Sequence, residues 1–173
     1  SPYASVDLPY LKYTQSAYVM TFTYVHPQNP PAYPPYSLTR NSNTSWGFSL
    51  DNFASSLSAP FTVRGTALSS STLSTWYSYV ITGVRANGEE SNPSGVVKIQ
   101  NNDLSLFAGS NIITWAQLPG ATSYNIYAST PSYGGENIPG GIYGFIGTSV
   151  GTSFTDTNII PDFTKVPPQH TNP

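Results

Sequence analysis

Residues 76–94 read WYSYVITGVRANGEESNPS, and this stretch decides the class of fold. Over its first ten positions bulky residues alternate with others, which is the period of a β-strand. One face of that strand would carry Tyr77, Tyr79, Ile81 and Gly83. The pair Asn87-Gly88 then indicates a tight hairpin, because both central positions of a type I′ turn need positive φ. We therefore predict a long strand at 76–85 and a return strand at 95–99.

Strand patterns continue beyond this hairpin at roughly ten-residue spacing, which is typical of an all-β sandwich. Further strands are expected at 61–66, 111–116, 143–150 and 153–157, and around Tyr124. The predicted fold is all-β: an immunoglobulin- or fibronectin III-like sandwich with a small β extension before it. Its expected core is Tyr77, Tyr79, Ile81, Ile113, Trp115, Tyr124 and Ile126.

Three segments are expected along the chain. Residues 1–57 form an N-terminal β extension with a proline-rich loop, residues 58–160 form the sandwich, and residues 161–173 read as a proline-rich linker. The extension is too short for an independent core, so pairing with another chain is expected. Its strand at 18–25 has a bulky face, and the loop after it holds five prolines. The candidate assembly contacts are Tyr18, Met20, Phe22, Tyr24, Pro31, Tyr33 and Tyr36.

The composition excludes several classes of protein. Charged residues make up 8% of the 173 positions, whereas an ordinary domain has about 25%. The net charge is −2, so the chain lacks the basic surface that a nucleic-acid partner requires. Cysteine is absent, which rules out disulfides and thiolate metal sites. No apolar run reaches the roughly 18 residues that a membrane-spanning helix needs.

Catalytic chemistry finds little support in the sequence. The eight acidic residues fall mostly in predicted turns, where backbone capping explains them. The two histidines, His26 and His170, lie apart in proline-rich segments, and no nucleophile-elbow motif is present. We expect no enzymatic activity, no catalytic or metal-binding residues and no cofactor.

Two motifs resemble fibronectin type III domains. Residues 77–94 are similar to that family's last hairpin, and residues 112–127, IITWAQLPGATSYNIY, are similar to its second and third strands. In the family the tryptophan strand comes first and the hairpin last, whereas this chain has the reverse order. Either the sandwich is rewired, or the motifs are halves of different units.

The same pair of motifs resembles a module of phage and prophage structural proteins. Residues 154–168, FTDTNIIPDFTKVPP, are similar to the exit of that module. Residues 7–40 and Trp46 are similar to a segment of long tail proteins of short-tailed phages, including nozzle-type ones. Tyr18 stands where that segment has Asp. Since the chain begins Ser1-Pro2 and is shorter than such proteins, we expect a processed chain, a fragment of a longer protein or a free-standing relative.

The resemblance implies a virion structural protein, assembled in the host cytoplasm. We expect it to hold other copies of itself and other virion proteins through sheet edges and Pro/Tyr loops, because a charge-poor aromatic surface costs little to desolvate. A glycan- or receptor-binding module remains an alternative, with Tyr33, Tyr36, Tyr133 and Tyr143 as the aromatic candidates. A passive spacer of a secreted protein is the third.

Overall fold

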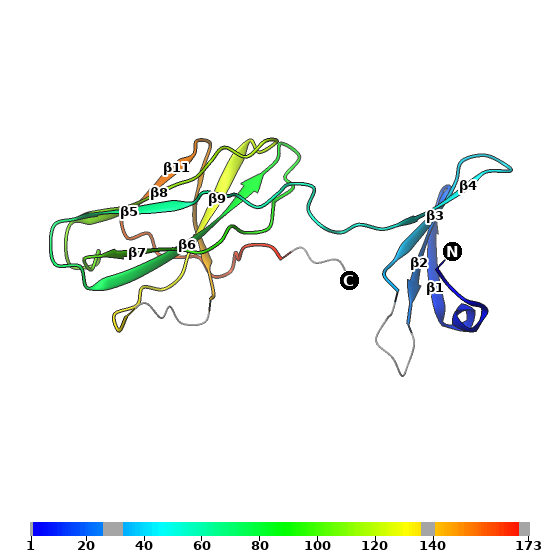
Figure 1. Cartoon of the computed structure of the whole chain (residues 1–173), viewed down its shortest axis with the longest axis horizontal. Coiled ribbons are helices and arrows are strands. Elements are labelled where there is room, and N and C mark those ends of the chain that lie inside the picture. The colour runs from blue at the N-terminus through cyan, green and yellow to red at the C-terminus, as the bar shows by residue number, and fades with distance from the viewer. Residues whose placement is uncertain (1, 26–32, 136–140, 170–173) are drawn as a thin grey trace. The chain divides into compact units, whose positions relative to one another are not determined.

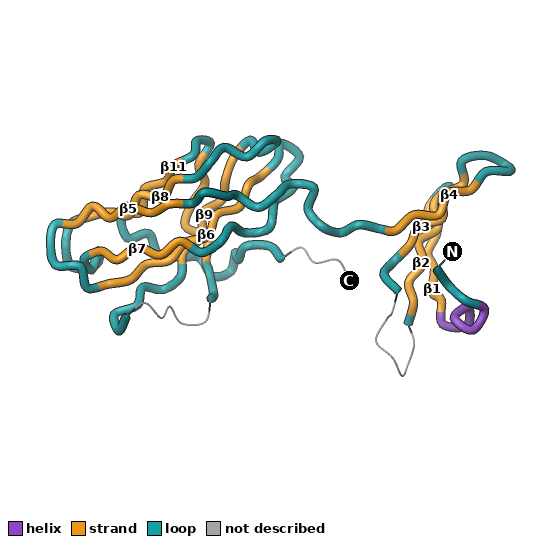
Figure 2. The backbone as a smooth tube through the Cα atoms, viewed as in Figure 1, coloured by secondary structure: helices purple, strands orange, loops and turns teal. Residues whose placement is uncertain are grey.

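The computed structural model describes residues 2–25, 33–135 and 141–169, and it is all-β (Figure 1). Strands dominate both of its compact units, and the only helix in the described part of the chain is one short 3₁₀ turn (Figure 2). The N-terminal unit ends at Ala54, and the second unit begins at Ser55. None of the described helical residues form a segment that could cross a membrane.

The N-terminal unit is a single antiparallel sheet. The 3₁₀ helix η1 (Ser5–Tyr10) is followed by four strands, each of which pairs with the next one along the chain. These strands are β1 (Leu11–Ser16), β2 (Val19–Tyr24), β3 (Tyr36–Arg40) and β4 (Trp46–Leu50). The sequence analysis missed η1 and β1. Ala17 closes the β1–β2 turn with φ 50°, a left-handed conformation that few non-glycine residues adopt.

The second unit is a sandwich of two antiparallel sheets. One sheet has the order β10-β9-β6-β7, and the other has the order β11-β8-β5. The strands are β5 (Arg64–Ser69), β6 (Thr75–Val84), β7 (Val97–Asn101), β8 (Gly109–Thr114), β9 (Ser123–Ala128), β10 (Gly144–Ser149) and β11 (Ser153–Asp156).

The long strand β6 occupies a central position next to β9. Ile81 of β6 lies opposite Ile126 of β9, and Gly83 lies opposite Tyr124. This pairing joins the hairpin motif to the tryptophan motif within one sheet. The two motifs therefore belong to one sandwich, and they are not halves of different units.

The core lies between the two sheets. All seven residues expected there are buried, each with at most 5% of its surface exposed. Trp115 packs edge-on against Tyr124 with ring centroids 5.2 Å apart. Residues outside the predicted set complete the cluster: Leu57, Ile99, Leu104, Leu118, Ala128 and Ile146.

Two local predictions were wrong. Only Gly88 of the Asn87-Gly88 pair has positive φ, so the turn is not type I′. It closes instead between Arg85 and Glu89, where the Arg85 backbone N–H donates to the Glu89 carbonyl at 2.9 Å.

The segment 161–173, expected to be a linker, begins with a part that is fixed to β10. There Phe145 exchanges two backbone hydrogen bonds with Asp162, at 2.9 and 3.1 Å.

A buried polar chain crosses the core and connects strands of both sheets. The Asn101 side chain donates to Asn111 Oδ1 at 2.7 Å, and Asn111 Nδ2 donates to the Tyr79 hydroxyl at 2.7 Å. Tyr79 in turn donates to Asp156 Oδ2 at 2.7 Å. Asp156 Oδ1 accepts the backbone N–H groups of residues 158 and 159. Burial and the Asp156 carboxylate raise the pKa of Tyr79 far above its ordinary value, so this hydroxyl stays a donor.

Replacing Tyr79 by Phe removes the central link of that chain. Asp156 and Asn111 would each lose a partner inside the core, which costs about 1–3 kcal/mol of unfolding free energy. Urea unfolding of the full chain, followed by tryptophan fluorescence, measures this loss. The exposed Tyr133→Phe is the matched control and should change stability by less than about 0.5 kcal/mol. If the two variants unfold at the same urea concentration, the buried hydrogen bonds of Tyr79 contribute nothing to stability.

The sheets approach closely where β5 passes over β7. A Cβ placed on Gly65 would lie 2.4 Å from Ile99 Cγ1 and 3.3 Å from Val97 Cγ2. Gly65→Ala should therefore destabilise the sandwich by about 1–3 kcal/mol, because Ile99 must leave its packing position. Gly95→Ala adds the same methyl group with no atom within 4 Å. A thermal melt in which both variants lose the same stability would contradict this packing.

Candidate functional site

The N-terminal sheet has two chemically different faces. On β2, Met20, Phe22 and Tyr24 alternate with Val19, Thr21 and Thr23, and the strand register extends both sets across the sheet. We call one side the aromatic face: Leu11, Tyr13, Met20, Phe22, Tyr24, Tyr36, Leu38, Trp46, Phe48 and Leu50, with the polar residues Gln15 and Arg40 toward one end of it. The other is the hydroxyl face, with Thr14, Ser16, Thr21, Thr23, Ser37, Thr39 and Ser49.

Aromatic rings hold the aromatic face together. Tyr36 stacks on Phe48 with centroids 5.0 Å apart and planes inclined by 6°. Tyr24 meets Tyr33 edge-on at 5.2 Å, and Tyr3 meets Tyr33 edge-on at 5.4 Å. Each such pair contributes about 0.5–1.5 kcal/mol beyond the area it buries. The cluster is therefore the small core of this unit.

The segment before β1 covers only part of the aromatic face. Asp7 of η1 is buried and accepts the Ala4 backbone N–H at 2.8 Å, which fixes the start of the segment. Burial and the neighbouring Asp7 carboxylate raise the pKa of Tyr24. Yet Tyr13 is 69% exposed and Leu50 is 51% exposed, although both point to the apolar side. A sheet with one apolar face normally buries it against a second layer, and the described residues of this unit form only part of such a layer.

An apolar pocket opens in the aromatic face. Its volume is about 350 Å³, and it is lined by Tyr3, Leu8, Leu11, Phe22, Leu38 and Phe48. None of the described residues in this lining carries a charged side chain. The pocket can accept an apolar side chain from a partner, which is how the anchor residues of interfaces are usually seated.

The seven predicted assembly contacts have different positions in the structure. Met20, Phe22, Tyr24 and Tyr36 lie on the aromatic face, Tyr33 packs beside it, and Tyr18 stands at its end. Pro31 lies outside the described residues, as does most of the Pro30-Pro31-Ala32-Tyr33 motif. Sequence reasoning missed Leu11, Tyr13, Leu38, Phe48 and Leu50. The alternation of apolar with other residues is present in 46–50 and at the start of 11–16. In 11–16 the polar neighbours obscure it.

The four tyrosines considered for sugar binding are divided between the units. Tyr33 and Tyr36 belong to the N-terminal unit and pack in its aromatic cluster. Tyr133 and Tyr143 belong to the second unit. Tyr133 is exposed, while Tyr143 is half-buried and its hydroxyl accepts from Ser78 at 3.4 Å. The four therefore do not form a single binding platform within either unit.

Groups that could hold a metal are not found among the described residues, where no three His, Cys, Asp or Glu side chains gather. Glu89, adjacent in sequence to Glu90, accepts the Ser56 backbone N–H at its Oε1 atom at 2.7 Å, and hydrogen bonds from the Ser56 backbone and side chain lower the pKa of Glu89. Glu90 instead accepts the Tyr127 hydroxyl at 2.6 Å. The two carboxylates thus have separate structural partners. Comparison with protein-family models, curated proteins and solved structures gives no match for this chain.

Proposed function

We propose that the protein is a structural component of a phage particle or phage-like assembly, and that its N-terminal sheet is the joint. The observation that carries the proposal is the incompletely covered aromatic face with its apolar pocket. Within the chain, the sandwich buries the inward face of each of its sheets. The N-terminal sheet has no described second layer beyond the short segment before β1.

Association through this face is favourable for two reasons. Tyr, Trp and Phe are enriched in the centres of interfaces because they bury a large area. The described residues that line the pocket of this face carry no charge, so little solvation is lost when the pocket is covered. We expect the partners to be further copies of the chain and other proteins of the particle.

The phage assignment itself rests on the resemblance in residues 77–94, 112–127 and 154–168. The sandwich brings the first two of these motifs into adjacent strands, and the third contributes β11 and the segment attached to β10. This arrangement supports a module in which all three motifs act together. The localisation proposed with it is the virion.

A pair of substitutions on the aromatic face tests the joint. The double variant Tyr13→Ser with Leu50→Ser removes two exposed side chains from the edge strands β1 and β4. Because both side chains are exposed, we expect the sheet to keep its fold. We expect incorporation into purified particles to fall at least about tenfold, the size of a modest hot spot. Quantitative mass spectrometry of the particles, normalised to the amount of soluble protein, measures this ratio.

The matched control lies one residue away on the same two strands. Thr14→Ala with Ser49→Ala changes the hydroxyl face and should leave incorporation unchanged. Circular dichroism of both variants checks that the sheets persist. The proposal fails if the chain is absent from particles, or if the aromatic-face variant enters them as well as the wild type does.

A further inference from the structure

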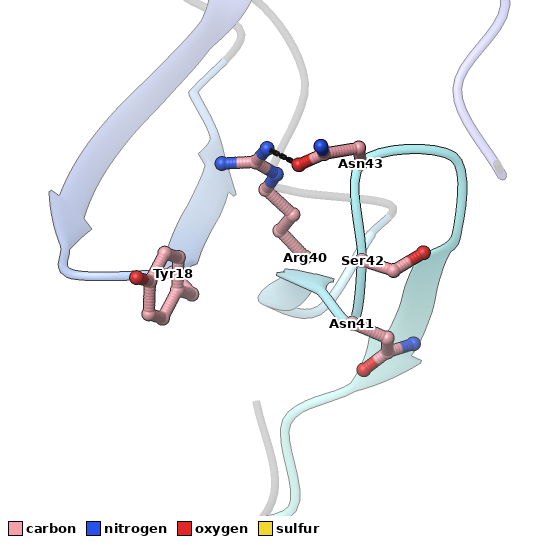
Figure 3. A pocket seen from close by; sticks show the side chains of 5 residues that line it. All are labelled: Tyr18, Arg40, Asn41, Ser42 and Asn43. Carbon is pink, nitrogen blue, oxygen red and sulfur yellow. Dashed lines mark hydrogen bonds between the residues drawn. The ribbon is translucent and has the colours of Figure 1, made fainter.

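A second pocket lies at the end of the N-terminal sheet, and its chemistry differs from that of the apolar pocket. Its volume is about 260 Å³, and it is lined by Tyr18, Arg40, Asn41, Ser42 and Asn43 (Figure 3). Tyr18 belongs to the β1–β2 turn, and the other four lie at the end of β3 and in the turn that follows. The Arg40 backbone N–H donates to the Tyr18 carbonyl at 2.8 Å, which holds the two segments together.

Arg40 supplies the positive charge of this pocket. Its guanidinium donates to the Asn43 side-chain oxygen, as Figure 3 shows, and its Cζ atom lies 5.9 Å from the centre of the Trp46 ring. Both contacts orient the guanidinium. A guanidinium has five N–H donors, and Arg40 forms no ion pair within the described chain. An arginine held in this way is suited to a carboxylate, which its planar fork can bind through two hydrogen bonds.

The described carboxylates of the chain have other partners. Each accepts a hydrogen bond from a nearby backbone or side-chain group. These carboxylates are Asp7, Asp51, Glu89, Glu90, Asp103, Asp156 and Asp162. The anion that would match Arg40 is therefore expected to come from a molecule other than this part of the chain.

We propose that this pocket binds a carboxylate-bearing sugar, such as a uronic or sialic acid residue of a surface polysaccharide. Arg40 would bind the carboxylate, and the Tyr18 ring, 67% exposed, would lie against the C–H groups of the sugar ring. Asn41 and Ser42 offer donors and acceptors together, which sugar hydroxyls require. The inference can be tested separately from the assembly role, because the described linings of the two pockets share no residue and, in the lining of this pocket, only Tyr18 is also a candidate assembly contact.

The polar lining favours a sugar over an acidic peptide. A peptide anchors mainly through apolar or aromatic side chains, and the pocket suited to these is the apolar one on the aromatic face. The pocket at Arg40 has one ring and four polar side chains in its lining. Binding of an acidic peptide is thus the competing outcome of the experiment.

Titration calorimetry of the full chain with trigalacturonate and with 3′-sialyllactose tests the proposal, with galactotriose and lactose as the neutral counterparts. We expect at least one acidic sugar to bind at least about tenfold more tightly than its neutral counterpart, since a charge-assisted pair of hydrogen bonds contributes on this scale. Arg40→Gln should remove that difference, and Arg40→Lys should restore only part of it because the fork is lost. Tyr18→Ser should weaken binding of the same sugar.

Lys12→Gln is the matched control. Lys12 is the other basic residue of the described N-terminal sheet and projects with the hydroxyl face, opposite Thr23. Its removal should leave sugar binding unchanged, as should Tyr13→Ser with Leu50→Ser. The proposal is overturned if neither acidic sugar binds, if Lys12→Gln weakens binding as much as Arg40→Gln, or if a hexa-aspartate peptide binds as well as the sugars. Circular dichroism of the Arg40 variants separates lost binding from lost folding.

Discussion

A β-sheet with one apolar face must cover that face, and this constraint governs both units of the chain. In the second unit two sheets cover each other, and residues such as Tyr79, Ile81, Ile113 and Ile126 have no exposed surface. Among its described residues, the N-terminal unit has a short 3₁₀ helix and Tyr3 to cover a sheet face of ten apolar or aromatic residues. Part of that face stays open, and the account of function follows from this difference.

The sandwich combines apolar packing with buried hydrogen bonds. The hydrogen-bonded chain from Asn101 through Tyr79 to Asp156 connects β7, β8, β6 and β11 inside a core that is otherwise apolar. Buried polar groups of this kind are costly when a partner is missing. They therefore favour one spatial arrangement of the strands, in which β6 and β7 of one sheet are linked to β8 and β11 of the other. The C-terminal segment adds to the same unit through Phe145 and Asp162.

Sequence reasoning succeeded where a strand is buried on at least one side and carries bulky residues at every second position. The prediction of 76–85 corresponds to β6 at Thr75–Val84, and the expected core residues are all buried. Strand β1 was missed because Lys12, Thr14 and Ser16 make it read as polar, although Leu11 and Tyr13 supply the apolar alternation. The tail was misread because prolines suggest a linker, whereas its attachment depends on backbone groups that no side-chain pattern reveals.

The two pockets were beyond sequence reasoning for a related reason. The apolar pocket needs Tyr3 and Leu8 from the segment before β1 to lie over Phe22, Leu38 and Phe48. The polar pocket needs two turns, at Tyr18 and at 41–43, to lie at the same end of the sheet. Both depend on the register of β2 with β3. Composition showed that the chain is poor in charge, but only the register shows where the few charges lie.

Side-chain footprinting with hydroxyl radicals tests the central claim most directly. The chain would be labelled alone and within its native assembly, and the modification of Tyr13, Leu50 and the single methionine, Met20, would be compared. We predict strong protection of these three residues in the assembly, while Tyr133 of the second unit keeps its reactivity. Equal labelling of the aromatic face in both states would contradict the account.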